Sequence, residues 1–318
     1  MFLRQFQYLI ALKQEAHFGR AAERCFVSQP SLSSAIKKLE EELGVPIILR
    51  DQNFQGFTTE GLRVVEWAKR LLADRNAMLD DLAIMQKNLL GHLRIAAMPT
   101  SSPMLPIVAR MFQQKYPAVQ LDIQFMGIDQ LTLALKNFEL DVGFTDLDQL
   151  TDSRLETLPL YEEPLHLLLP NNDWLDDAPE VSWATAAELP LCLLSPSMRE
   201  RQMINAAFAS VDCEPTPRLE SNSIFQLAFH VMAGGLATIV PKRFTVLPGT
   251  RAKRLVNPTI SQKLGLVWVK GNPILPMAKA VIEMLTQAVA DDVFKDIHTL
   301  LEINDKPDTP RQISTKSK

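Results

Sequence analysis

The 318-residue sequence has little cysteine, no excess of positive charge and no long apolar run. Its three cysteines, Cys25, Cys192 and Cys213, are an odd number without close spacing, which fits a reducing compartment better than a disulfide framework. No apolar run approaches the roughly 18 residues needed to cross a bilayer. Arg4 and Lys13 interrupt the apolar start of the chain before a signal sequence can form. We therefore expect a soluble, cytoplasmic protein.

The sequence also lacks the common signatures of catalysis. It contains no GxSxG, GxGxxG, P-loop or HExxH motif. Its five histidines are scattered without ligand spacing, so we expect no metal, no cofactor and no enzymatic activity. The net charge of −4 gives no overall attraction for nucleic acid, and any affinity for DNA has to be local. The length suits about two domains.

Apolar residues recur at helical spacing in three short segments near the start of the chain. The three sets are Leu3, Phe6, Leu9 and Ile10; Ala21, Ala22 and Cys25; and Leu32, Ile36, Leu39 and Leu43. Ser28 is the predicted cap of the third helix, and Gly44 ends it. Two short strands, at residues 47–49 and 57–58, are expected to flank a polar tip at residues 51–56.

One long helix is predicted from residue 59 to about residue 88, because neither Gly nor Pro occurs there after Gly61. Its apolar residues have near-heptad spacing and are Leu62, Val65, Leu72, Leu79, Leu82 and Met85. An exposed helix cannot bury such a stripe alone, so a partner helix is expected. The alternative is that the stripe packs against the chain's own first domain.

Beyond Gly91 the pattern changes to alternating strands and helices. The predicted strands include 93–97, 121–126 and 141–144, and the predicted helices include 103–116, 130–137 and 277–290. This alternation indicates a parallel-rich sheet with helices on its faces. The residues beyond 304 are polar and contain two prolines, so we expect a disordered tail at 304–318.

Five segments of the head form one recognisable pattern, joined more loosely by later positions; the segments are 18–24, 27–33, 36–40, 43–46 and 58–61, and the later positions are Pro117, 140–143 and 234–237. Through these segments the sequence resembles the LysR-type transcriptional regulators along nearly its whole length. The resemblance implies an all-α winged helix-turn-helix DNA-binding domain (1–58), a dimerising linker helix (59–88) and a two-lobed α/β effector domain (89–303) like the periplasmic binding proteins. It places lobe 1 at about 92–163 and 268–303, and lobe 2 at about 164–267.

A helix-turn-helix places the N-terminal residues of its second helix against base edges in the major groove. That helix and the wing supply the candidate DNA-binding residues Gln29, Pro30, Ser31, Ser33, Ser34, Lys37 and Arg50. Lys37 and Arg50 are expected to neutralise phosphates. The alternative for the serines is helix capping, which we favour for Ser28.

Several residues of this head depart from what is usual in the family. Ser34 replaces a longer, often basic residue, and Asn53 and Gly56 stand where wing arginines are common. His17 and Gly19 replace a usual Ser and Thr. Positive and negative charges of the head balance, so we expect weak non-specific DNA binding with a shallow salt dependence. Dimerisation then has to supply the affinity.

In a two-lobed α/β domain, ligands bind in the crevice at the carboxyl ends of the strands. Thr100, Ser101 and Ser102 follow the first strand at a helix N-terminus, which suits a carboxylate or another small anion, although capping explains such residues equally well. Further candidate effector-binding residues are Thr145, Ser195, Ser197, Ser223 and Phe225. Arg199 and Arg201 either complete an anion clamp or are solvated surface charges, and Phe225 either lines the cleft or belongs to the core.

The resulting hypothesis is a regulator that binds an interrupted inverted repeat in double-stranded DNA as a dimer, and by resemblance as a tetramer. A small-molecule effector, with an anion as one candidate, would shift the lobes and change the spacing of the DNA-binding heads. The alternatives are a small-molecule-binding protein without regulatory DNA binding, and a regulator that senses redox through Cys192 and Cys213.

Overall fold

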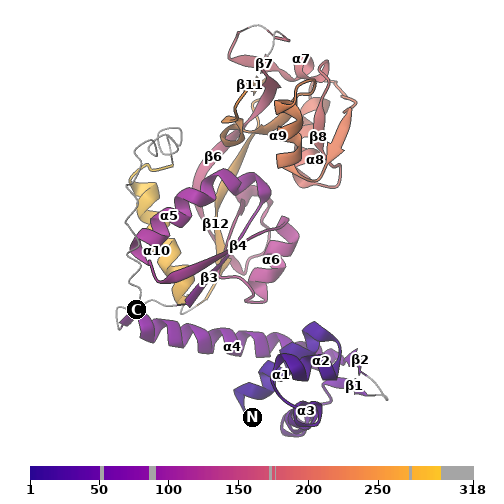
Figure 1. Ribbon diagram of the computed structural model, residues 1–318, viewed down its shortest axis with the longest axis vertical. Coiled ribbons are helices and arrows are strands. Elements are labelled where there is room, and N and C mark those ends of the chain that lie inside the picture. Colours follow the sequence, from indigo (N-terminus) through magenta and orange to yellow (C-terminus); the bar gives the residue numbers. More distant parts are fainter. Residues whose placement is uncertain (51–53, 86–90, 172–173, 176, 272–273, 295–318) are drawn as a thin grey trace, which may run out of the picture.

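The structure is a computed structural model that describes residues 1–50, 54–85, 91–171, 174–175, 177–271 and 274–294. The predicted wing tip at 51–53, the last residues of the predicted linker helix and the predicted tail lie outside the described residues. Figure 1 shows the N-terminal head at one end, one long helix running beneath lobe 1, and lobe 2 farthest from the head. None of the helices in the described part of the chain has the length and apolar character needed to cross a bilayer.

The head is a three-helix unit with a short hairpin. Its elements are α1 (Leu3–Glu15), α2 (Phe18–Arg24), α3 (Gln29–Leu43), β1 (Ile48–Arg50) and β2 (Phe54–Phe57). The predicted apolar faces meet in one core, which contains Leu9, Ala21, Leu32, Ile36 and Leu39 at 0–1% exposure. The second strand begins earlier than predicted, because residues 54–56 continue the pairing with β1. Thr58 is therefore outside the strand.

Thr58 instead begins the linker helix, α4 (Thr59–Met85), which is 27 residues long. The Thr58 hydroxyl accepts a hydrogen bond from the N–H of Gly61 at 2.8 Å and donates one to the carbonyl of Pro46. Position 61 has to be glycine here, because a Cβ atom would lie 2.0 Å from the carbonyl oxygen of Ile47. The wing and the linker helix are thus fixed to each other by close backbone approach.

The predicted stripe of α4 is divided between two environments. Val65 and Leu72 pack against the head, as the alternative for this helix required. Three residues of the stripe stay exposed, namely Leu62, Leu79 and Leu82. The side chain of Met85 is not among those that the structure describes. Spacings of four, seven and four residues place four exposed side chains on one face of the helix: Trp67, Leu71, Met78 and Leu82.

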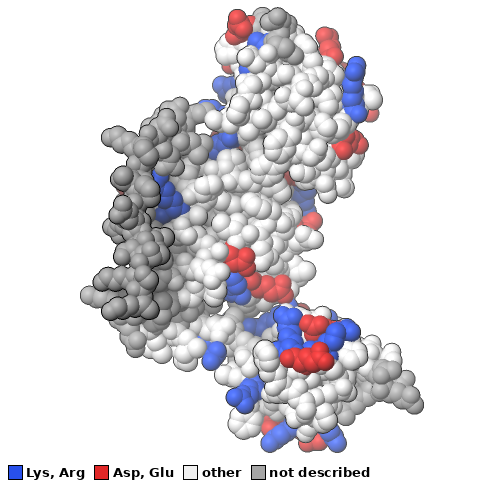
Figure 2. Space-filling view, in the orientation of Figure 1, with Lys and Arg blue, Asp and Glu red and all other residues white. Residues whose placement is uncertain are grey.

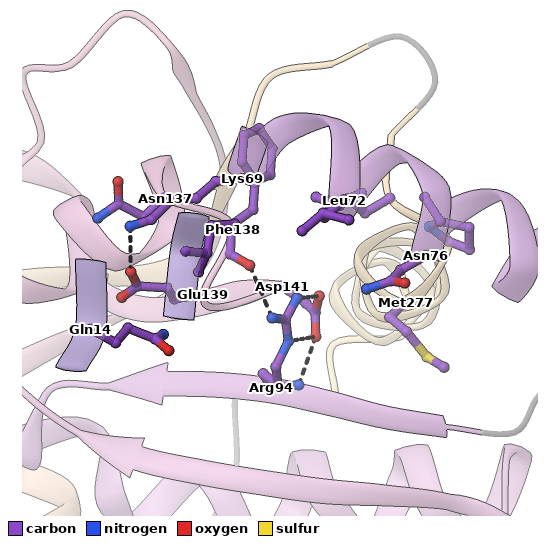
Figure 3. A pocket seen from close by; sticks show the side chains of 15 residues that line it. Gln14, Lys69, Leu72, Asn76, Arg94, Asn137, Phe138, Glu139, Asp141 and Met277 are labelled. Carbon is purple, nitrogen blue, oxygen red and sulfur yellow. Dashed lines mark hydrogen bonds and ion pairs between the residues drawn. The ribbon is translucent and has the colours of Figure 1, made fainter. Parts of the chain in front are cut away.

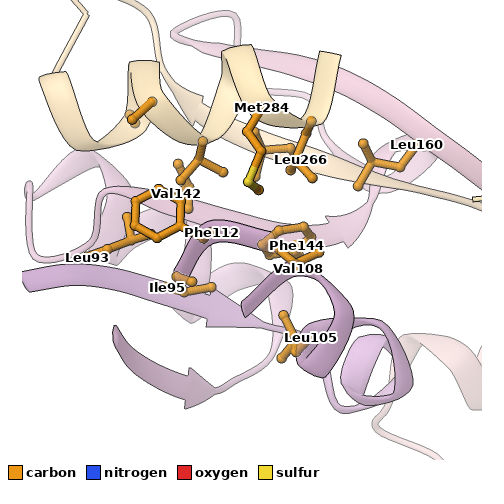
Figure 4. Packing of buried hydrophobic residues seen from close by; sticks show 14 of the residues in the cluster. Leu93, Ile95, Leu105, Val108, Phe112, Val142, Phe144, Leu160, Leu266 and Met284 are labelled. Atoms are coloured by element: carbon orange, nitrogen blue, oxygen red, sulfur yellow. The ribbon is translucent and has the colours of Figure 1, made fainter. Parts of the chain in front are cut away.

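Lobe 1 is an open sheet covered on both faces. Its elements are β3 (Gly91–Ala97), η1 (Pro99–Met104), α5 (Leu105–Lys115), β4 (Val119–Phe125), α6 (Ile128–Lys136), β5 (Val142–Asp146), η2 (Leu147–Gln149), β12 (Ser261–Val269) and α10 (Pro276–Ala290). The strand order is β4-β3-β5-β12, with β3 parallel to both of its neighbours. Side chains of α5 and α10 fill the main core around Phe112, Phe144 and Met284 (Figure 4). α6 covers the other face through Leu131 and Leu135.

Lobe 2 is built around the second half of β6. Its elements are β6 (Leu155–Pro170), β7 (Glu180–Ser182), α7 (Trp183–Ala187), β8 (Cys192–Leu194), α8 (Arg199–Ala209), β9 (Leu219–Ser221), α9 (Ile224–Met232), β10 (Thr238–Pro241), η3 (Lys242–Thr245) and β11 (Thr250–Val256). Up to Pro164, β6 pairs with β12, and from Leu165 onward it pairs with β10 and β11. The lobe boundary expected between residues 267 and 268 differs from the strand pairing, because β12 pairs with β5 of lobe 1 from Leu264 to Val267.

A buried ion pair connects the two lobes beside this change of partners. Arg243 of η3 pairs with Glu163 of β6, which is 1% exposed, and its backbone N–H donates to the same carboxylate at 2.6 Å. The Arg243 guanidinium also donates to the carbonyl of Phe294 at 2.8 Å and lies 3.6 Å from the ring centroid of Tyr161. Burial raises the pKa of the Glu163 carboxyl, although the Arg243 charge opposes the shift. The pair therefore ties lobe 2 to the crossing strand and to the end of lobe 1.

Replacing Glu163 by Ala is expected to destabilise the effector domain strongly, because the Arg243 guanidinium then stays buried without its carboxylate. Breaking a buried pair in this way costs about 3–5 kcal/mol. Urea unfolding followed by circular dichroism measures the change. The matched control is Glu162→Ala at the neighbouring exposed position, which should change the free energy of unfolding by about 0.5 kcal/mol or less. Equal effects of the two substitutions would show that the pair does not hold the lobes.

Candidate DNA interface and effector cleft

The N-terminal half of α3 presents the predicted DNA-contacting residues to solvent. All six that lie on this helix are exposed: Gln29, Pro30, Ser31, Ser33, Ser34 and Lys37. Pro30, Ser33, Ser34 and Lys37 share one face, opposite the buried Leu32 and Leu39 side of the helix. This is the arrangement that a helix needs to enter a groove while its other face packs on the head.

Two of the predicted DNA-contacting residues, Ser31 and Arg50, differ from the other five. The Ser31 hydroxyl is 2.8 Å from the Ser28 hydroxyl, and the Ser31 N–H donates to Ser28 Oγ, so both residues take part in capping α3. Arg50 is the last residue of β1, and its side chain is outside the description. Asn53, one of the departures from the family, falls outside the described residues. Gly56 lies within β2 in a conformation with φ of +132°.

The departures at His17 and Gly19 explain each other. His17 caps α2, because its Nδ1 accepts hydrogen bonds from the N–H groups of Gly19 at 3.0 Å and Arg20 at 3.3 Å. A Cβ atom on residue 19 would lie 3.0 Å from the His17 ring. The imidazole thus caps α2 in place of a serine, and the larger ring leaves little room for a side chain at position 19, which favours glycine there.

The charges of the head are partly neutralised within it. Glu15 pairs with Arg24 at 2.9 Å and lies 3.7 Å from Arg20. Figure 2 shows Lys and Arg side chains interspersed with Asp and Glu on the visible face of the head. Lys37 makes no ion pair among the described residues and extends from the exposed face of α3.

Sequence reasoning missed Phe26, which is 95% exposed in a left-handed conformation at the turn before α3.

In lobe 1 the predicted effector residues gather at one edge of the sheet. β3 and β5 are parallel neighbours, so their carboxyl ends meet, and Met98 joins them: its Sδ accepts from the Thr145 hydroxyl at 2.9 Å. Thr100 and Ser101 are buried at 5% and 2% exposure, and neither hydroxyl has a partner among the described residues. Ser102 differs, because its hydroxyl donates to the carbonyl of Pro99 at 2.6 Å. The structure therefore supports Thr100 and Ser101 as ligand-facing candidates more than Ser102.

In lobe 2 the predicted residues have mixed roles. Ser195 and Ser197 lie in the turn between β8 and α8, where Ser195 is half-buried and Ser197 exposed. Ser223 is the cap of α9, because its hydroxyl accepts from the N–H of Gln226 at 3.3 Å. Phe225 is 46% exposed and packs edge-on against Phe244 with 5.5 Å between ring centroids. Capping thus accounts for Ser223, and Phe225 is not a core residue.

The structure does not show the anion clamp that was one alternative for Arg199 and Arg201, and only Arg199, which is 47% exposed, is a surface charge. Arg201 is buried at 6% exposure, and its guanidinium donates to the Glu220 carboxylate, the Leu194 carbonyl and Asn205. The expectation of a solvated charge at this position was therefore also wrong. Arg199 pairs with Asp129 at the start of α6, 3.1 Å away, so it bridges the lobes instead.

Two buried carboxylates lie where the sequence analysis expected an anion site. Asp146 ends β5 at 3% exposure, and its oxygens accept from the Asp148 N–H and the Gln149 side chain. Glu200, in the first turn of α8, is 8% exposed. Burial raises the pKa of both carboxyl groups, and the charge of Asp146 raises the pKa of Glu200 further, so the two groups from opposite lobes interact. Single acidic residues in separate segments gave no sequence signal for this pairing.

The thiols do not form a pair. Cys192 faces the core layer that contains Leu194, whereas the half-buried Cys213 packs on the opposite layer with Leu193. Alternate residues of a strand point to opposite faces, so β8 separates the two sulfur atoms. Burial raises the pKa of the Cys192 thiol to about 11. The described residues also contain no group of three or more His, Cys, Asp or Glu side chains arranged to hold a metal ion.

Comparison with known proteins agrees with this architecture. Residues 3–62 match the family model of bacterial regulatory helix-turn-helix proteins of the lysR family, and residues 86–290 match the LysR substrate binding domain. The chain is 28% identical over 296 residues to the DNA-binding transcriptional dual regulator OxyR of Escherichia coli strain K12, covering 91% of this chain and 95% of that one. It is also 28% identical over 308 residues to the hydrogen peroxide-inducible genes activator of Haemophilus influenzae, covering 92% and 97%.

Among solved structures, full-length OxyR from Pseudomonas aeruginosa with a cysteine-to-aspartate change aligns with a TM-score of 0.70 at 27% identity. The alignment covers 91% of this chain and 97% of that one. The likeness includes the order of head, linker helix and two-lobed domain. Because the substrate binding domain alone spans more than half of the chain, and the helix-turn-helix model spans the head, this protein belongs to the LysR family of transcriptional regulators.

Proposed function

We propose that this regulator reads an interrupted inverted repeat in double-stranded DNA through the exposed face of α3, and that a small molecule in the interlobe cleft controls the reading. The observation that carries the proposal is the placement of Ser33 and Lys37 on the solvent face of a capped helix whose other face is core, with Gln29 exposed in the first turn of the same helix. Amide and hydroxyl side chains suit base edges, and Lys37 suits a phosphate. Binding DNA makes the cytoplasm its site of action, and no catalytic role is assigned.

Oligomerisation supports this function through two exposed apolar faces. The face of α4 defined by Trp67, Leu71, Met78 and Leu82 suits a second copy of the same helix, which gives a dimer. A second face on α9 consists of Phe225, Phe229 and Met232, which are 38–60% exposed and spaced four and three residues apart. Pairing through this face joins dimers into a homotetramer. The dimer sets the spacing of the two heads on the half-sites.

Substitutions on α3 distinguish base reading from phosphate binding. Lys37→Ala should weaken binding to all DNA sequences alike and reduce the salt slope by about 0.9. Gln29→Ala should instead relax the preference for operator over scrambled DNA by about 1–3 kcal/mol. Fluorescence anisotropy across a salt series, with the DNA upstream of the protein's own gene, measures both. The control is Lys38→Ala, whose ammonium lies over the Phe2 ring away from the proposed contacts. The proposal fails if neither Lys37→Ala nor Gln29→Ala differs from this control.

The charge of the cleft favours an effector that carries a positive charge or several hydrogen-bond donors. We infer this from the two buried carboxylates of Asp146 and Glu200 and from the pairing of the buried Arg201 with Glu220. The charge of the exposed Arg199 offsets only part of this, because the pKa of Glu200 stays raised. Bringing the lobes together places two negative groups near each other, which a cation between them relieves and an anion aggravates. The unpartnered Thr100 and Ser101 hydroxyls provide acceptors for the same ligand. This differs from the anion considered on sequence grounds.

Thermal unfolding of the full-length protein with small amines, guanidines and carboxylates tests the effector charge. A cation present at 100 times its Kd should stabilise the protein by about 2.7 kcal/mol, and carboxylates should not. Asp146→Asn and Glu200→Gln should each abolish the effect, whereas Asp148→Asn, at a side chain that is 59% exposed, should retain it. Because both carboxyl pKa values are raised, cation affinity should increase as the pH rises through them. Stabilisation by carboxylates alone would contradict the inference.

Redox sensing is the second candidate function, because relatives include a hydrogen peroxide-inducible genes activator. The positions of the thiols argue against this function in the present chain. A thiolate is the reactive form, and the buried Cys192 thiol has a pKa of about 11. A bridge between Cys192 and Cys213 also requires lobe 2 to rearrange, because β8 lies between them.

Hydrogen peroxide is therefore expected to leave the Cys192 thiol reduced and to form no bridge to Cys213. Mass spectrometry after alkylation of the native full-length protein measures both outcomes, and the urea-unfolded protein, in which all three thiols should react, is the control. DNA binding should be equal before and after peroxide treatment. A peroxide-induced Cys192–Cys213 bridge that changes DNA binding would establish redox sensing instead.

A further inference from the structure

Within the described residues, the linker helix α4 contacts lobe 1 along α10 and at the turn between α6 and β5, where an ion pair joins the two. Lys69 of α4 pairs with Glu139 of lobe 1, with 2.9 Å between Nζ and Oε1. The Lys69 side chain is only 17% exposed, so it is held against lobe 1 and does not extend into solvent. Figure 3 shows Glu139 and Phe138 on the side of their turn that faces α4, opposite Lys69 and Leu72. The contact thus joins the linker helix to the turn between α6 and β5.

The lobe 1 side of this contact is rigid. Arg94 of β3 holds the Asp141 carboxylate through both of its oxygens, at 2.7 and 3.2 Å, and donates to the carbonyl of Phe138 at 2.9 Å. The N–H groups of Phe138 and Glu139 donate back to the last turn of α6 in a Schellman arrangement. The turn is therefore fixed to the lobe 1 sheet and moves with it.

Phe138 is an unusual residue for its position. It has a φ of +56° at the site after the helix end where glycine is favoured, and a bulky side chain there costs free energy. Its ring does not belong to either core of lobe 1 and instead lines the space between the turn and α4. Strain of this kind at an exposed turn indicates that the side chain has a use outside lobe 1.

The interface around these residues is incompletely packed. A cavity of about 190 Å³ lies between the two parts of the chain, lined from the head side by residues such as Gln14 and Leu72 and from lobe 1 by Asn137 and Phe138. An interface made of a few polar contacts around a cavity is weaker than a closely packed core, so the interface between α4 and lobe 1 can open and close.

The geometry points to a docking contact, formed by Lys69 against Glu139 and Phe138, through which the position of lobe 1 sets the angle of the linker helix and so of the DNA-binding head. Movement of lobe 1 on effector binding would either rotate the linker helix through this contact, and so move the DNA-binding head, or break the contact. The transmission to DNA rests on the proposed function, whereas the contact itself does not.

Charge reversal tests the contact in the full-length protein without an effector. Glu139→Lys and Lys69→Glu each place like charges together, and hydrogen exchange in α4 around Lys69 and in the turn at 137–139 should accelerate roughly two- to fivefold. The double variant, with the charges exchanged, should restore protection. Glu214→Lys in lobe 2 makes the same charge change at an exposed site away from α4 and should change neither segment.

Phe138→Gly gives a second, independent measurement. Glycine suits the backbone conformation, so lobe 1 should keep its thermal stability while α4 loses protection near Lys69.

On DNA selected in vitro by the wild-type protein, the bend angle measured by gel mobility should change in both single charge variants and return to the wild-type value in the double variant. If the singles match the wild type in exchange, or if the double variant fails to restore it, the docking contact is refuted. Failure to bind any DNA, with the exchange pattern as expected, refutes only the proposed function.

Discussion

The effector domain depends on one antiparallel pair of strands, because β6 and β12 are the elements on which both lobes are assembled. β6 changes partners between Pro164 and Leu165 and so belongs to two sheets in turn. Hydrogen bonding on either side of this change leaves the strand little freedom, and the buried pair of Glu163 and Arg243 clamps the same place. β6 is therefore held firmly on both sides of the point where the two lobes meet.

The chemistry of the cleft follows from the way the two lobes meet. Helix and strand ends that are separate in the sequence deliver two buried carboxylates and two buried hydroxyls to one edge, because each lobe contributes the ends of its own strands. Two arginines of lobe 2 have carboxylate partners, Arg199 with Asp129 and Arg201 with Glu220. Under the proposed function, an excess of buried carboxylates at this edge favours a cationic ligand over an anionic one, because charges interact strongly in a medium of low dielectric constant.

The helices and strands of this structure could be predicted from the sequence, whereas the contacts between residues of distant segments could not. Periodicity identified the three head helices and the αβ alternation, because Leu9, Leu32 and Ile36 are spaced for one face of a helix. Capping identified Ser28, and the family motif located the exposed face of α3. Which face of α4 packs on the head was missed: Val65 and Leu72 share helical spacing with the exposed residues, and only the tertiary structure separates them.

The same limit explains the errors in the cleft. Arginine is usually a surface residue, and the burial of Arg201 depends on Glu220 and Leu194, which approach it only after folding. Asp146 and Glu200 are 54 positions apart and belong to different lobes. No sequence pattern links them.

The weak charge of the head gives the internal contacts their importance. The positive and negative charges of the head balance, and Glu15 partly neutralises Arg20 and Arg24, so little binding free energy is expected from electrostatic attraction alone. Affinity must then come from holding two heads at the right separation, since each badly placed head forfeits its base contacts. Gly61 fixes the wing to α4 by a backbone approach that tolerates no side chain, which makes the head and linker helix one rigid lever. Lobe 1 contacts the linker helix at Lys69, beyond the wing hairpin, so under the proposed docking contact a rotation of lobe 1 changes the orientation of α3 as long as the contact stays closed.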